Sequence, residues 1–87
     1  MPRYLVESYS SGAAVDEARE RARLTARLGA GVTYVRTTFL PGDETVLHMF
    51  EAPSVEALGK AGRLAALEFQ RIVEAVEALP QEDGAEG

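Results

Sequence analysis

The 87-residue sequence contains no cysteine and only one histidine. Without cysteine there is neither a disulfide framework nor a thiolate metal site. With a single imidazole, the other ligands of a bound metal would have to be carboxylates, hydroxyls and water. Such a ligand set holds nickel or zinc weakly. The lack of cysteine also fits a reducing compartment, so we expect a cytoplasmic protein.

Long apolar runs and an excess of positive charge are missing too. No run approaches the roughly 20 apolar residues of a membrane-spanning helix, and strand-like sequence follows Met1 almost at once, so we expect neither a membrane span nor a signal peptide. The net charge is −5, and residues 1–80 carry nine basic against eleven acidic side chains. Because this balance gives no positive field for a phosphate backbone, nucleic acid is not an expected partner.

The length allows one domain, which we place at residues 1–80. A chain of this size buries only about 60 to 65% of its unfolded surface, so its core is small. With no disulfide to reinforce that core, we expect a homodimer to add buried area. Residues 81–87 are polar, acidic and glycine-containing, and they are expected to form a disordered tail.

The apolar pattern divides the chain into alternating elements. It predicts strands at 3–9, 32–40 and 44–52, a tight turn at 41–43, and helices at 13–28 and 55–64, the second capped by Ser54. Gly29 and Gly31 end a helix and precede a strand, which predicts a left-handed helix stop and not a phosphate-binding loop.

Residues 71–79 are ambiguous. Locally they fit a helical period. The predicted elements before them, however, follow the order βαββα. A βαββαβ unit is completed by a fourth strand beside the first. We therefore predict a strand at 71–79 and a ferredoxin-like α+β fold with an antiparallel four-stranded sheet.

The stretch from Thr45 to Ser54 holds the histidine, His48, in an almost wholly apolar strand. Such a run predicts a strand buried on both faces, with the imidazole in a dry environment. Alternation places Leu47 and Met49 on one face, and Val46, His48 and Phe50 on the other.

Three roles are open to His48: a metal ligand, an acid or base, or a hydrogen-bonded core residue. If the protein is catalytic, we expect His48 to transfer the proton, Glu7 to orient it, and Tyr34 to donate to a developing oxyanion. The simpler alternatives are that Glu7 reaches solvent and that Tyr34 is a core aromatic with its hydroxyl at the rim. No serine or lysine lies in a recognisable nucleophile motif.

Four passages carry a family resemblance. They are MPRYLVE at 1–7, LGAGVTYV at 28–35, FEAPSVEA at 50–57 and RIVEAVE at 71–77. Together they resemble the bacterial nickel-binding-protein-like family of small ferredoxin-like proteins. The resemblance implies a ferredoxin-like fold, and at least one branch of the family binds nickel as a homodimer. It places His48 at a metal position in the third strand, whereas the second helix lacks the histidines that the family often has there.

These observations lead to two functional expectations. Because the strands are apolar on both faces, a second copy in a dimeric α/β-barrel-type association should cover the face that the helices leave free, enclosing a pocket with His48. Tyr9, Met49 and Phe50 are the expected ligand contacts. The first expectation is a homodimeric protein that binds a small ligand or a divalent metal, nickel by resemblance. The alternative is a cofactor-independent cyclase, isomerase or monooxygenase-like enzyme acting on a small apolar substrate.

Overall fold

The computed structural model describes residues 1–78. In chain order its elements are β1 (Arg3–Tyr9), the 3-10 turn η1 (Gly12–Ala14), α1 (Val15–Leu28), β2 (Thr33–Leu40), β3 (Thr45–Glu51), α2 (Val55–Leu64) and β4 (Arg71–Ala75). The strands form one antiparallel sheet in the order β2-β3-β1-β4. This arrangement is the predicted ferredoxin-like α+β fold. The expected tail at 81–87 and the expected domain end at residue 80 lie outside the described residues.

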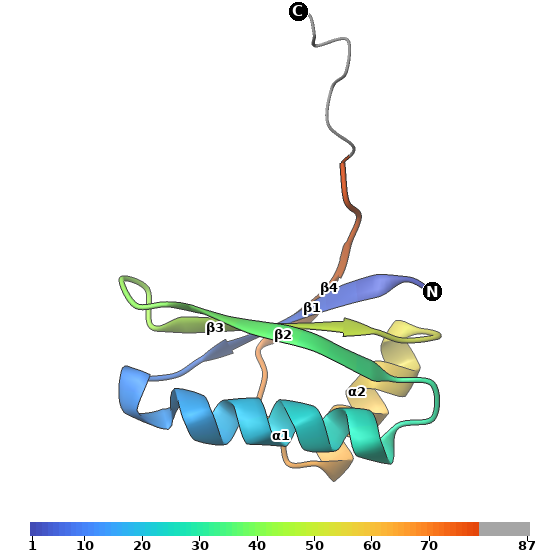
Figure 1. Cartoon of the computed structure of the whole chain (residues 1–87), viewed down its shortest axis with the longest axis horizontal. Helices are drawn as coiled ribbons and strands as arrows, with labels where there is room; N and C mark the ends of the chain where they lie inside the picture. Colours follow the sequence, from blue (N-terminus) through green and yellow to red (C-terminus); the bar gives the residue numbers. More distant parts are fainter. Residues whose placement is uncertain (79–87) are drawn as a thin grey trace, which may run out of the picture.

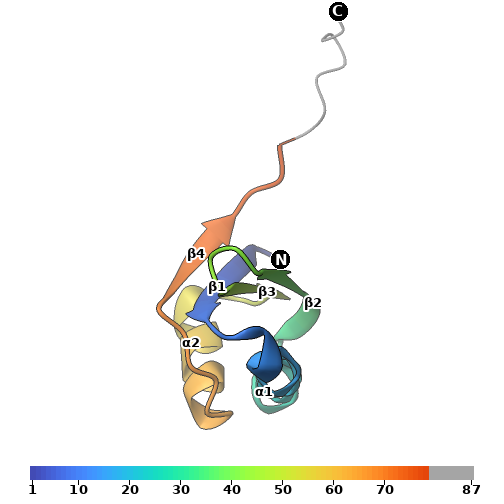
Figure 2. The ribbon, with the colours of Figure 1, turned by 90° about the vertical axis from the view of Figure 1, so that its left-hand side faces the viewer.

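The molecule has two layers, with both helices on one face of the sheet (Figure 1, Figure 2). The core lies between the layers, where Val6 and Phe50 from the sheet meet Ala22 of α1 and Leu58 of α2. None of the helices within residues 1–78 is long and apolar enough to cross a membrane.

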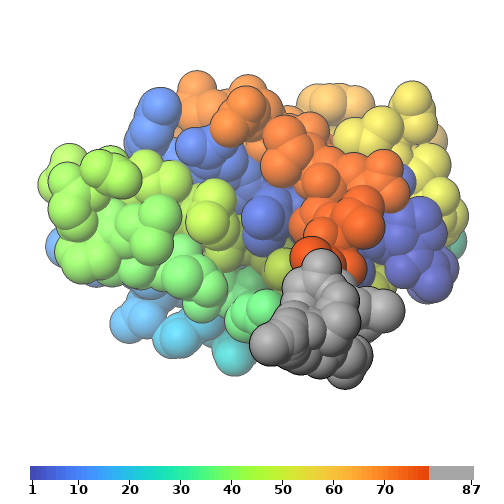
Figure 3. Space-filling model, turned by 90° about the horizontal axis from the view of Figure 1, so that it is seen from above, coloured from blue at the N-terminus to red at the C-terminus, as the bar shows by residue number. Residues whose placement is uncertain are grey.

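The other side of the sheet, here called the open face, has no covering layer within residues 1–78. The alternation of side chains along each strand shows which residues lie on the open face. Val6 points into the core, so the residues next to it in β1 point the opposite way. Figure 3 shows this side of the molecule. The open face consists of Arg3, Leu5, Glu7 and Tyr9 on β1, Thr33, Arg36, Thr38 and Leu40 on β2, Thr45, Leu47, Met49 and Glu51 on β3, and Arg71, Val73 and Ala75 on β4.

The left-handed residue predicted after α1 is present, and it is Gly31. Gly29 has φ −98°, so it is not the left-handed residue, and Gly31 takes that conformation with φ 75°. A Cβ on Gly29 would lie 2.7 Å from the Cβ of Ala61 on α2. Glycine at 29 therefore permits close contact between the two helices, whereas Gly31 makes the turn.

The predicted cap of α2 is confirmed, since the Ser54 hydroxyl accepts a hydrogen bond from the Ala57 amide at 3.1 Å. The predicted last strand exists beside β1, but it ends at Ala75 and not at 79. The residues after it rise on the open-face side, away from the helices (Figure 1, Figure 2), and Val76 is 82% exposed.

Candidate functional site

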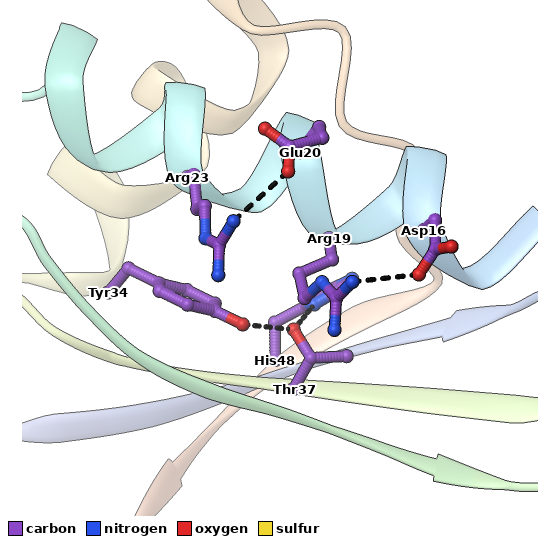
Figure 4. A network of polar contacts seen from close by, with 7 residues as sticks. All are labelled: Asp16, Arg19, Glu20, Arg23, Tyr34, Thr37 and His48. Carbon is purple, nitrogen blue, oxygen red and sulfur yellow. Dashed lines mark hydrogen bonds and ion pairs between the residues drawn. The ribbon is translucent and has the colours of Figure 1, made fainter.

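A chain of hydrogen bonds links three side chains beneath α1, and we call it the buried relay. His48 on β3 is fully buried, as predicted, and its Nδ1 lies 2.8 Å from Oγ1 of Thr37 on β2. The same Thr37 oxygen lies 2.6 Å from the Tyr34 hydroxyl (Figure 4). Tyr34 also packs edge-on against Phe50, with ring centroids 5.8 Å apart. The relay therefore contains two of the three predicted catalytic residues, joined through a threonine.

Burial determines the charge of the imidazole. It lowers the pKa of His48 from 6.5 to about 4, because the charged form loses its hydration. The ring is therefore neutral at pH 7 and holds one proton. Its Nε2 is buried and has no hydrogen-bond partner within residues 1–78. The relay therefore ends at this atom.

Two arginines of α1 lie over the relay (Figure 4). Arg19 points toward the sheet and pairs with Asp16 at 2.8 Å (Figure 4), while its Nε is buried without a hydrogen-bond partner among the described residues. The Arg23 guanidinium lies 5.8 Å from the centre of the Tyr34 ring, within range of a cation–π contact. Neither arginine, nor Thr37, was a candidate from the sequence.

Glu7 lies on the other side of the sheet from the relay. In the β1–β3 register His48 stands opposite Val6, whereas Glu7 stands opposite Leu47. Glu7 instead pairs with Arg71 on β4 at 2.6 Å. The predicted contact between Glu7 and His48 is therefore not formed.

The position of His48 also corrects the predicted pocket. The imidazole lies between the sheet and the helices, not on the open face. If a second copy covered the open face, the imidazole would still lie on the opposite side of the sheet. A pocket between two copies would therefore not contain His48.

The three expected ligand contacts are separated. Phe50 is fully buried in the core, whereas Tyr9 is 67% exposed at the end of β1, and Met49 is partly buried on the open face. Tyr9 borders one of the two cavities described next and Met49 borders the other, whereas Phe50 lines neither.

Two cavities formed by residues 1–78 have expected ligand contacts in their walls. The larger, about 510 Å³, is a half-open groove at one end of the sheet, lined by Ser8, Tyr9, Ser10, Ser11, Ala14, Glu17, Ala18, Arg21, Ala66, Leu67 and Glu68. The smaller, about 160 Å³, lies on the open face and is lined by Arg3, Arg36, Met49, Ala75, Val76 and Glu77. We call the first the end groove and the second the Arg36 pocket. His48 lines neither.

A metal role for His48 finds no supporting ligands in this part of the chain. Among residues 1–78, no three histidine, cysteine, aspartate or glutamate side chains gather closely enough to hold an ion. The Nδ1 of His48 is already engaged with Thr37.

Comparison with known proteins supports the fold. No protein-family model matches the chain, and no curated protein matches it. The crystal structure of SCO4226 from Streptomyces coelicolor A3(2) is similar, with a TM-score of 0.69 over 88% of this chain and 99% of that one. The two share 15% sequence identity, a level at which the likeness shows the architecture alone.

Proposed function

We propose that this protein is a homodimeric binding protein for a small organic ligand, with two copies joined through their open faces and the ligand held between them. The observation that carries the proposal is the composition of the open face. Its centre is formed by Leu5, Leu47, Met49 and Val73, which are neighbours across three strands. An apolar centre without a covering layer is the usual mark of an interaction surface.

The charges around this centre suit a second copy of the chain as the covering partner. Glu7 pairs with Arg71 at 2.6 Å, and Glu51 pairs with Arg3 at 3.1 Å, on either side of the apolar residues. Since both carboxylates already have partners, a second copy can approach without leaving either of them unpaired. Dimerisation also adds the buried area that a small chain without disulfides lacks.

The size of the face is compatible with a dimer. Four strands about 4.8 Å apart, with roughly seven residues each at about 3.3 Å per residue, outline roughly 400 Å². Side chains projecting from the sheet increase the accessible area, and a specific interface needs about 800 Å² per partner. Residues 76–78 rise on the same side and add further area.

An organic ligand is preferred over a metal and over catalysis. The metal form of the proposal, nickel at His48, has no set of co-ligands in residues 1–78. The alternative of a cofactor-independent enzyme is favoured by the buried relay, which could shuttle a proton. It would, however, need a substrate to reach a fully buried imidazole that borders neither cavity. We place the protein in the cytoplasm because it has no cysteine.

A charge at the centre of the open face tests the proposal. Leu5→Glu should give a folded monomer that no longer binds the neutral fluorescent probe 1-naphthaleneethanol, because a carboxylate cannot be buried there unpaired. The matched control is Leu64→Glu, at a 65% exposed position on α2, and it should keep both the dimer and the probe. Light scattering coupled to gel filtration gives the mass, and circular dichroism checks the fold. Leu5→Glu behaving like the control would refute the proposal.

A further inference from the structure

A β-bulge determines which face of the sheet carries Arg36. In the β2–β3 register Tyr34 stands opposite Phe50, but Arg36, not Val35, stands opposite Met49. Val35 is thus an extra residue in β2. With regular pairing, Arg36 would stand opposite His48 beneath the helices. The bulge turns Arg36 onto the open face beside Met49, and it brings Thr37 into the buried relay.

Arg36 is the unbalanced charge of the open face. The sheet presents three arginines and two glutamates there, and each glutamate is already taken: Glu7 by Arg71 and Glu51 by Arg3. Within residues 1–78, Arg36 forms no ion pair and no side-chain hydrogen bond. Each copy therefore brings to this surface one guanidinium that forms no ion pair within residues 1–78.

Arg36 borders a cavity of mixed chemistry. Met49, Ala75 and Val76 supply apolar walls, and Arg36 and Arg3 supply guanidinium groups. Glu77 also lines the cavity, but it forms no ion pair with either arginine within residues 1–78. The cavity holds about 160 Å³, which is less than the roughly 300 Å³ at the lower end of small-molecule sites. One chain thus forms part of a site, which a second copy would complete.

We infer that the Arg36 pocket binds the carboxylate group of a small amphipathic ligand, whose apolar part lies against Met49 and Val76 between the two copies. The inference rests on the proposed function. A guanidinium that loses water at an interface is destabilising unless an anion accompanies it, and the ligand supplies that anion. The planar fork of arginine matches a carboxylate with two parallel hydrogen bonds, and the apolar walls of the cavity suit the organic part of such an anion.

Two probes that differ only in the head group test the inference. 1-Naphthylacetate carries a carboxylate, whereas 1-naphthaleneethanol carries a hydroxyl on the same ring system. The chain has no tryptophan, so naphthalene fluorescence can be titrated with little protein background. The unsubstituted protein should bind the acid at least about tenfold more tightly than the alcohol, as expected for a charge-assisted hydrogen bond.

Arg36→Gln should abolish this preference, with the acid affinity falling about tenfold to that of the alcohol and the alcohol affinity unchanged. The control is Arg27→Gln at an exposed position on α1, which removes the same charge far from the open face and should leave both affinities unchanged. Equal binding of the acid by the two variants, or no preference for the acid in the unsubstituted protein, would overturn the inference and leave the proposed function standing. A protein that binds neither probe would overturn both.

Discussion

Acid should destabilise this protein through His48. The folded-state pKa of about 4 lies below the ordinary value of 6.5, so between these values the unfolded chain binds the proton more readily. Stability therefore rises with pH across this window and is lost as the pH falls through it. With these two pKa values, lowering the pH from about 7 to about 4.5 should reduce the free energy of unfolding by about 2 kcal/mol through this one residue.

The assay is urea unfolding at both pH values, at equal protein concentration, for the unsubstituted chain and for His48→Gln. Glutamine cannot titrate, so the variant should lose about 2 kcal/mol less on acidification, although it is less stable at pH 7. Carboxylates that titrate over the same range contribute equally to both proteins and cancel in the comparison. The same pH dependence in both proteins would refute the burial argument.

Two further substitutions test the packing around the helices and the relay. Gly29→Ala should lower the free energy of unfolding by about 1 to 3 kcal/mol, because the new methyl group would lie 2.7 Å from the Cβ of Ala61; chemical denaturation that shows no loss would contradict the close helix contact. Thr37→Val should cost about 1 to 3 kcal/mol by leaving Nδ1 of His48 and the Tyr34 hydroxyl without their shared partner. Unchanged stability of this variant, together with an unchanged pKa of His48 by NMR titration, would argue against the relay.

The sequence was sufficient to predict the fold and to predict which residues within a strand share a face. Alternation along β3 correctly placed Val46 and His48 on one face and Leu47 and Met49 on the other. It could not relate β3 to β1, because a shift of one residue in register exchanges the faces. For this reason the expected contact between Glu7 and His48 is wrong, although the face of His48 within its own strand was correctly assigned.

The residues that escaped prediction depend on local departures from regular structure. The extra residue Val35 reverses the faces of β2 beyond it, so no alternation pattern could place Thr37 beside His48 or Arg36 on the open face. Arg19 belongs to the charged side of an amphipathic helix, yet its long side chain reaches the sheet (Figure 4). The last strand was predictable only from the topology, because five residues are too few for period alone to separate strand from helix.

The central claim is that the open face is covered by a second copy of the chain. Sedimentation equilibrium of the unsubstituted protein, from micromolar to submillimolar concentration, tests it most directly. The account predicts a mass twice the 9.4 kDa of one chain at the upper concentrations. The mass of a single chain throughout that range would contradict it.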